Sequence, residues 1–363
     1  MTPRNPWILL LVISGLLAGC GQPAPLPTPQ VVAASPFPTP FEVPSPTLPP
    51  EETSTPDPYS GLTIASLAAR SYGGGGLLDL GILAVEPGFT RHLVSYPSDG
   101  LTINGFMDIP TGKGPFPVVL VLHGYVDPDG YQVETYTEGY AASFANAGLI
   151  AIHPNYRNYP PSDSGPNEFR VGFAVDVLNL VAIVNARAGL GELLQAADPD
   201  AIFLWGHSMG GGIALRVLTV GSDVQGAVLY GSMSGDERRN FEHIRDVLSG
   251  GTRGLEELNA PDEVLQLISP IYFYERISVP VSIHHGDADE VVPLAWSQEL
   301  CGQLQALGKQ VECFTYHNMP HTFYGENNEL LIGRSIEFFE SLMPRESLQI
   351  YDLGAHLFPV DVQ

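Results

Sequence analysis

The sequence predicts an α/β fold with a mostly parallel central sheet and helices on both faces. Short runs such as residues 118–122 and 201–205 are apolar throughout, which is typical of strands buried on both faces. Longer segments with helical periodicity, such as 209–220, alternate with these runs. Strands separated by helices favour parallel pairing, because each helix carries the chain back to the start of the next strand.

The elements are expected in the following order. A short helix over residues 62–72 precedes a flexible run of glycines at 73–76. Residues 92–96 and 101–109 flank a Pro-Ser-Asp-Gly turn, which predicts a hairpin. After it, strands are expected over 118–122, 149–152, 201–205, 227–230, 281–284 and 311–316, and helices over 137–147, 171–188, 209–220, 295–307 and 330–342.

Residues 236–268 interrupt this alternation. They are charged, helical in pattern and too long for a simple connection between two strands. We interpret them as a small helical cap, at about 234–270, over the C-terminal edge of the sheet. Surface helices without ligand contact are the alternative that the sequence leaves open.

The chain is strongly acidic. It carries 40 Asp and Glu against 16 Lys and Arg, a formal charge of −24 at pH 7. This charge repels phosphate backbones, and the basic residues form no cluster. No nucleic acid is therefore expected as a partner.

Residues 1–20 predict export and a membrane anchor. Arg4 precedes an apolar run, 7–17, that is shorter than the roughly 20 apolar residues of a spanning helix, so a cleaved signal peptide is expected. The run leads into Leu-Ala-Gly-Cys, which resembles the bacterial lipobox, so Cys20 is expected to be lipidated and to tether the chain outside the cytoplasm. An ordinary secretory signal with a chance cysteine is the alternative. No later segment is expected to span a membrane.

Three further regions follow the signal. Residues 21–60 are rich in Pro, Thr and Ser without an apolar period, so they are expected to form an extended stalk. The stalk would hold the folded domain off the membrane, with a Pro-rich ligand for a partner as the alternative. Residues 61–345 are expected to form one catalytic domain, and 346–363 a C-terminal tail.

The candidate nucleophile is Ser208, within Gly-His-Ser-Met-Gly at residues 206–210. The run fits G-x-S-x-G and lies between an expected strand and an expected helix. A sharp turn there lifts the serine hydroxyl out of the sheet edge, and the glycines let neighbouring elements pack closely. The strand-turn-helix context makes the motif specific.

The candidate acid and base follow later strands. Asp289 and His321 each come just past the carboxyl end of an expected strand, which gives the order nucleophile, acid, base. His321 would take the proton of Ser208, and a buried Asp289 would hold the imidazole in one tautomer. The neighbouring Asp287 is the alternative acid.

The expected oxyanion donors are backbone N–H groups. Those of Tyr125, after an expected strand, and Met209, at the helix start, would bind the developing negative charge. His123 and His207 lie within glycine-flanked turns, and we interpret them as structural or hydrogen-bonding residues rather than bases.

No metal or other cofactor is expected. No histidine pair has the His-Glu-x-x-His spacing, and no Cys-x-x-Cys is present. Export would permit a disulfide between Cys301 and Cys313, expected on a helix and the following strand. Two free, buried cysteines are the alternative.

Several segments together resemble the catalytic domain of the prolyl oligopeptidase family and related esterases of the α/β-hydrolase superfamily. The resemblance spans roughly residues 62–342 and implies an α/β-hydrolase fold and serine hydrolase chemistry with the roles given above. The segments that carry it are 95–101, 114–125, 206–211 and 285–289.

Two features depart from that family. Its full-length peptidases carry a β-propeller before the catalytic domain, whereas here a stalk and a short lead-in precede it. After Tyr156-Arg157, many relatives continue with a glycine-rich turn, whereas this chain has Asn-Tyr-Pro-Pro-Ser in a loop expected to border the site.

The sequence therefore favours a carboxylic-ester hydrolase, acting through an acyl-enzyme on small acyl, acetyl or polyester substrates. An amino- or oligopeptidase acting on short peptides is the alternative. Acidic cap residues that bind a free amine would support it, with Glu256, Glu257, Asp262 and Glu263 as candidates. A non-catalytic binding lipoprotein is a third hypothesis, and such a protein would be expected to lose a member of the triad. The sequence predicts no oligomeric state.

Overall fold

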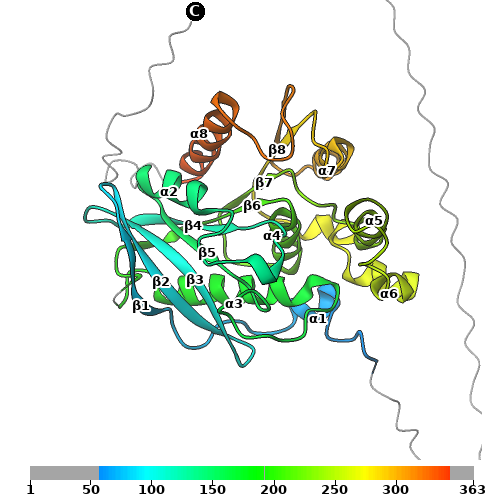
Figure 1. Ribbon diagram of the computed structural model, residues 1–363, viewed down its shortest axis with the longest axis horizontal. Helices are drawn as coiled ribbons and strands as arrows, with labels where there is room; N and C mark the ends of the chain where they lie inside the picture. Colours follow the sequence, from blue (N-terminus) through cyan, green and yellow to red (C-terminus); the bar gives the residue numbers. More distant parts are fainter. Residues whose placement is uncertain (1–56, 192, 344–363) are drawn as a thin grey trace, which may run out of the picture. The chain divides into compact units, whose positions relative to one another are not determined.

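A nine-stranded sheet organises the residues that the computed structural model describes, 57–191 and 193–343 (Figure 1). Its strand order is β1-β2-β3-β5-β4-β6-β7-β8-β9. Pairing is antiparallel from β1 through β3 to β5 and parallel from β5 to β9. The strands are β1 (Leu78–Val85), β2 (Phe89–Ser98), β3 (Leu101–Pro110), β4 (Phe116–Leu122), β5 (Ile150–Pro154), β6 (Ala197–His207), β7 (Gly226–Tyr230), β8 (Val281–Gly286) and β9 (Val311–Tyr316).

The predicted α/β fold with a mostly parallel sheet is confirmed, and all six expected parallel strands are present. Their apolar sequences are explained by burial on both faces. Alternate residues of β4 enter two separate cores: Leu120 and Leu122 belong to one, and Val119 and Val121 to the other. β4 is therefore covered on both sides in the middle of the sheet.

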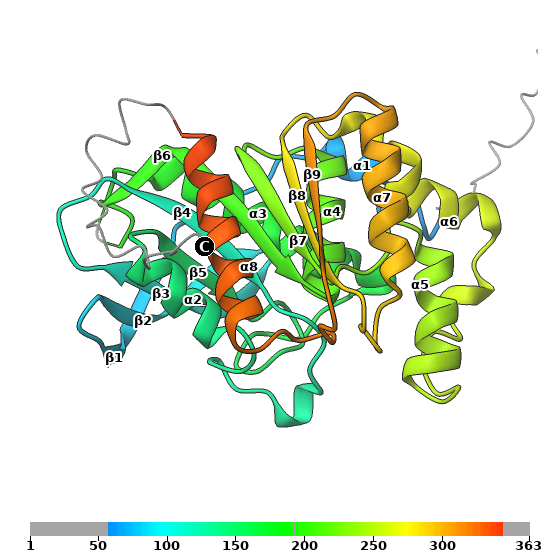
Figure 2. The same ribbon diagram turned by 90° about the horizontal axis from the view of Figure 1, so that it is seen from above.

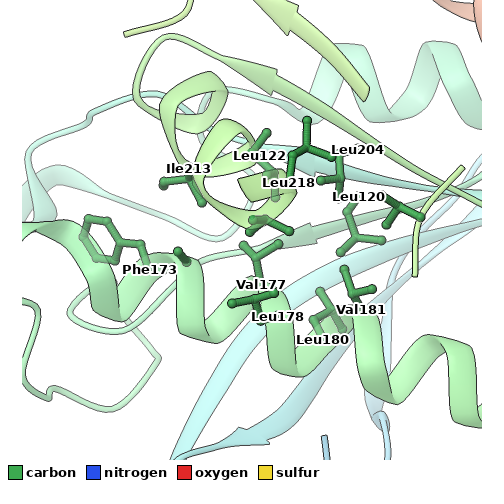
Figure 3. Packing of buried hydrophobic residues seen from close by; sticks show 14 of the residues in the cluster. Leu120, Leu122, Phe173, Val177, Leu178, Leu180, Val181, Leu204, Ile213 and Leu218 are labelled. Atoms are coloured by element: carbon green, nitrogen blue, oxygen red, sulfur yellow. The ribbon is translucent and has the colours of Figure 1, made fainter. Parts of the chain in front are cut away.

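Helices form the two covering layers (Figure 2). α3, α4 and α7 contribute to the core that contains Leu120, and Figure 3 shows Val177 and Leu218 packed near it. α2 and α8 contribute to the opposite core, through side chains such as Phe144 and Phe339. The helices are α1 (Ile64–Ala68), α2 (Glu138–Asn146), α3 (Val171–Arg187), α4 (Met209–Val220), α5 (Glu237–His243), α6 (Asp262–Ile268), α7 (Leu294–Ala306) and α8 (Glu326–Ser341).

The hairpin is confirmed as β2 and β3, with Ser98 paired to Leu101 across the turn. Asp99 and Gly100 turn the chain with φ of 50° and 83°, as a two-residue hairpin requires. β1 was not predicted. It pairs with β2 at the sheet edge and is exposed along nearly all of its length, so its apolar residues follow no inside–outside alternation.

One helix is long and apolar enough to span a membrane, contrary to the expectation that no later segment would be. The stretch Glu168–Arg187 is long and apolar enough by composition, with a mean hydropathy of 1.6. However, 78% of that window is buried inside the protein. The stretch contains α3, so its apolar character is that of a core helix packed on the sheet (Figure 3).

The segment between β7 and β8 is helical, as expected. It contains α5, a π-helix (Ile244–Leu248), a short 3₁₀ helix (Glu257–Asn259), α6 and a second 3₁₀ helix (Pro270–Arg276). Phe241 and Leu265 anchor it in the core. Arg253, within this segment, lies 4.7 Å from the ring centre of Tyr125, so the segment reaches the loop that follows β4.

Cys301 on α7 and Cys313 on β9 form a disulfide. Their Cα atoms are 6.4 Å apart, within the range that a disulfide spans. The structure thus contains the bridged alternative of the two that the sequence left open.

Several sequence predictions fall on residues outside the described ranges. These are the signal peptide at 1–20 with Cys20, nearly all of the stalk at 21–60, and the tail at 346–363. They stay predictions.

Candidate active site

Ser208 lies on a strained turn. β6 ends at His207 and α4 begins at Met209, so one residue turns the chain from strand into helix. Ser208 takes φ 57° and ψ −118°, a conformation that residues with a side chain rarely adopt. Such strain persists only where the surroundings enforce it, and it is concentrated at functional sites.

The flanking glycines permit this turn. A Cβ added at Gly206 would lie 2.4 Å from the carbonyl oxygen of Gly210, and one added at Gly210 would lie 2.1 Å from that of Leu122. Both distances are far below van der Waals contact. The glycines of the motif are therefore needed because the turn packs directly against itself and against the end of β4.

Asp289 and His321 form a hydrogen-bonded pair. The Nδ1 of His321 lies 2.8 Å from Oδ2 of Asp289. The other carboxylate oxygen accepts the N–H groups of Val291 and Val292, each at 2.8 Å. The Asp289 side chain is only 1% exposed, so it is held in place from both sides.

Asp287, the alternative acid, lies elsewhere. Its carboxylate is 2.8 Å from Nδ1 of His317, whose side chain is 82% exposed. It also accepts the N–H of Asn318 at 2.6 Å. Of the two candidate aspartates, the structure brings Asp289 to His321.

The surroundings of Asp289 favour its ionised form. Burial alone would raise the pKa of the carboxyl group, but hydrogen bonds from His285 and His321 and the N–H of Val292 outweigh it. The net result is a pKa below the ordinary value of an aspartate. Asp289 therefore carries a negative charge beside His321 at neutral pH.

Ser208 lies at the same end of the sheet as this pair. Its N–H donates to the carbonyl of Tyr230 at 2.9 Å. At the next residue, Gly231, an added Cβ would lie 3.3 Å from Nδ1 of His321 and 3.4 Å from Oδ2 of Asp289. Within the described part of the chain, no hydrogen bond joins the Ser208 hydroxyl to the imidazole, and such bonds often tighten only with substrate bound.

The two expected oxyanion donors border Ser208. Met209 is the first residue of α4, so its N–H has no acceptor within the helix. Tyr125 follows Gly124, where an added Cβ would lie 3.1 Å from the Cβ of Ser208. The loop after β4 thus passes directly beside the serine.

His207 is a hydrogen-bonding residue, as interpreted from the sequence. Its Nδ1 lies 2.7 Å from the Tyr136 hydroxyl, and its Nε2 lies 2.9 Å from the carbonyl of His321. Complete burial lowers the pKa of His207 well below its ordinary value, so it is neutral. It links the Ser208 turn to the His321 loop.

His123 is also buried and neutral. Its ring nitrogens contact the carbonyl oxygens of Gly124 and Asn155, and burial lowers its pKa to about 4. These contacts fix the loop that contains Tyr125, in agreement with a structural role.

Two neighbours of the site were missed in the sequence. Tyr136 contacts His207, although the two residues are far apart in the sequence and Tyr136 belongs to no recognisable motif. His285 lies inside the motif that contains Asp289, with its Nε2 3.1 Å from the Asp289 carboxylate. The motif marks His285 as a residue near the site, but it does not show which way the imidazole ring points.

No metal site is found among residues 57–191 and 193–343, where no three His, Cys, Asp or Glu side chains lie close enough to hold an ion. The buried histidines contact protein groups. His153 contacts the hydroxyls of Tyr131 and Thr137, and His284 those of Ser282 and Tyr316.

The arrangement defines the class of protein. A mostly parallel sheet with helices on both faces, a serine on a strained turn between strand and helix, and an Asp–His pair after two later strands are the features of an α/β hydrolase. The particular family follows from the sequence. Residues 103–337 match the dienelactone hydrolase family, and the chain belongs to that family.

Similar proteins include both peptidases and esterases. An uncharacterized peptidase, YtmA of Bacillus subtilis, is 23% identical over 69% of this chain and 93% of its own. The acetyl xylan esterase of Paenibacillus sp. R4 is 17% identical, with a TM-score of 0.58 over 77% of this chain and 92% of its own. A puromycin-hydrolyzing peptidase of Mycobacterium tuberculosis is 20% identical, with a TM-score of 0.56 over 72% of this chain and 41% of its own.

The likeness to these solved structures shows the α/β-hydrolase fold. The predicted class, a serine hydrolase, agrees with the family and with these relatives, which are hydrolases, esterases and peptidases. The resemblance predicted from the sequence is confirmed at the level of the superfamily.

Proposed function

We propose that the protein is a carboxylic-ester hydrolase that works through an acyl-enzyme on Ser208. The observation that carries the proposal is the buried Asp289–His321 pair, next to a serine held on a strained turn. An ionised carboxylate on Nδ1 leaves Nε2 of His321 free to accept the serine proton.

The reaction would proceed in two halves. The Ser208 oxygen attacks the ester carbonyl while His321 takes its proton, and the imidazolium then gives that proton to the departing alcohol. Water attacks the acyl-enzyme by the same route, with His321 as base and then as acid. Asp289 stabilises the imidazolium in each half.

The N–H groups of Tyr125 and Met209 would bind the oxygen that becomes negative in each tetrahedral intermediate. The support is that Met209 directly follows Ser208, that Gly124, the residue before Tyr125, lies beside Ser208, and that neither N–H is used by a neighbour within the described residues. A donor of this kind lowers the activation barrier by about 3 kcal/mol.

Two observations favour an ester over a peptide. The cap residue that contacts Tyr125 is a cation, Arg253, which does not suit the capture of a free amine. Among the acidic cap residues considered for that role, Asp262 is paired with Arg238.

The peptidase alternative retains one specific support. YtmA, named as a peptidase, is matched over 93% of its length. Short peptides with an activated amide bond are therefore the second substrate class to test.

The enzyme is proposed to act outside the cytoplasm, tethered through a lipid on Cys20. Two independent features support this location. The first is the lipobox-like Leu-Ala-Gly-Cys at the end of the apolar N-terminal run. The second is the Cys301–Cys313 disulfide, because such bonds persist mainly in oxidising compartments.

The function is tested by kcat/KM on p-nitrophenyl esters of increasing acyl length and on aminoacyl p-nitroanilides. We expect ester turnover that falls by at least about 10³-fold in Ser208→Ala, with little anilide cleavage. Efficient Ser208-dependent anilide cleavage would favour the peptidase instead. Absence of Ser208-dependent turnover on both series would contradict a hydrolase and favour a binding lipoprotein.

A further inference from the structure

The Asp289 carboxylate contacts a second imidazole besides that of His321. Its Oδ2 lies 2.8 Å from Nδ1 of His321 and 3.1 Å from Nε2 of His285. The His285 and Asp289 side chains are each 1% exposed, so water does not screen this contact. Oδ1 accepts the N–H groups of Val291 and Val292, so the two imidazoles are the neighbours of Oδ2.

The neighbours of His285 determine which of its nitrogens carries the proton. Nε2 is hydrogen-bonded to the carbonyl of Val292 at 2.9 Å and also lies 3.1 Å from the Asp289 carboxylate. Both neighbours can only accept, so Nε2 carries the proton. Nδ1 lies 2.7 Å from the hydroxyl of Ser297 on α7. With the proton on Nε2, Nδ1 can accept from the Ser297 hydroxyl.

We propose that Ser297 and His285 form a relay that positions the Asp289 carboxylate, with the Ser297 hydroxyl fixing the His285 tautomer and the His285 N–H keeping Asp289 directed at His321. The proposal rests on the proposed function, because it assigns the relay to the triad. His285 is a positioning residue, since it acts through Asp289.

The relay also weakens the electrostatic attraction between the Asp289 carboxylate and the protonated imidazole of His321. A carboxylate that shares its charge with an extra donor attracts the imidazolium proton less strongly. Loss of the His285 N–H should therefore raise the pH at which His321 loses its proton and becomes an active base. The other titratable groups beside His321 in the described structure are Glu290, which accepts the backbone N–H of His321 at 3.3 Å, and the neutral His207.

If His285 only stabilised the fold, replacing it would have the same effect as replacing another buried histidine. His284 provides that matched control. His284 is the preceding residue on β8, is also fully buried and makes two hydrogen bonds, to Ser282 and Tyr316 at 2.8 Å each. Successive side chains of a strand point to opposite faces, so His284 faces away from Asp289. Replacing it tests the cost of losing a buried histidine without touching the relay.

The test is the pH profile of kcat/KM on an activated ester for His285→Leu, His285→Gln, Ser297→Ala and His284→Leu. We expect the midpoint of the acid limb to rise by about one pH unit in His285→Leu, and by less in Ser297→Ala, in which the tautomer is no longer fixed. His285→Gln should restore the wild-type midpoint, because its amide can donate from the same place. His284→Leu should leave the midpoint unchanged.

The outcomes separate the relay from the proposed function. An acid limb unchanged in both His285→Leu and Ser297→Ala, with turnover still lost in Ser208→Ala, would overturn the relay alone. Equal shifts in His285→Leu and His284→Leu would also overturn it, because the shift would then reflect a general effect of losing a buried histidine on the fold. If His285→Leu does not fold, the pH profile of the milder variant Ser297→Ala decides whether the relay exists. Turnover that persists in Ser208→Ala would instead contradict the proposed function.

Discussion

At the scale of single residues, the site depends on the absence of side chains as much as on their presence. Ser208 can adopt its strained backbone because Gly206 and Gly210 let the turn close on itself. Gly231 leaves room for the Asp289–His321 pair next to the end of β7. The candidate site therefore lies where an added methyl group would push against its neighbours.

The positions of Ser208, Asp289 and His321 at the ends of strands could be predicted from the sequence, because the strand before each of them is indicated by its apolar residues. Their neighbours could not be predicted in the same way. His284 and His285 are adjacent, and only the pleat of β8 decides which of them faces Asp289. Tyr136 reaches His207 only through tertiary packing, and no local pattern encodes that contact.

The choice of acid yields a prediction for a pair of variants. Asp289→Asn should lower kcat by about 10²- to 10⁴-fold, because an amide in that place favours the wrong imidazole tautomer. Asp287→Asn removes a carboxylate that contacts only His317 and Asn318 in the described structure, so its kcat should stay within about threefold of the wild-type value. Steady-state kinetics of both variants checks this, and a larger loss in Asp287→Asn would reverse the assignment.

At the scale of elements, two connections tie segments around the site. The disulfide joins α7, which carries Ser297, to β9, which leads to His321. The helical segment between β7 and β8 reaches the loop after β4 through Arg253 and Tyr125. The sequence predicted that segment as a cap from its charge and length, but its contact with Tyr125 depends on how the segment folds back over the sheet.

The cap contact can be tested with two arginines. Arg253→Ala should reduce kcat/KM by about two- to fivefold, because an exposed cation–π contact contributes about 0.5–1 kcal/mol to holding the Tyr125 loop. Arg238→Ala removes a cap arginine that pairs with Asp262, and we expect no effect on kcat/KM. Equal effects of the two substitutions would mean that the loss of charge, and not the Tyr125 contact, matters.

At the scale of the whole molecule, the parallel sheet gathers the site. β4, β6, β8 and β9 run parallel, so the residues that follow them, from Tyr125 to His321, meet at one edge of the sheet. This part of the fold could be predicted because strands buried on both faces have continuous apolar sequences. β1 could not, because an exposed edge strand lacks both continuous burial and alternation.

The central claim is that Ser208 is a nucleophile activated by the Asp289–His321 pair. Its most direct test is mass-spectrometric mapping of the protein after reaction with a serine-directed phosphonate. The account predicts a single adduct on Ser208, absent in Ser208→Ala and formed at least about 10²-fold more slowly in His321→Ala. An adduct on another residue, or labelling at the wild-type rate in His321→Ala, would contradict it.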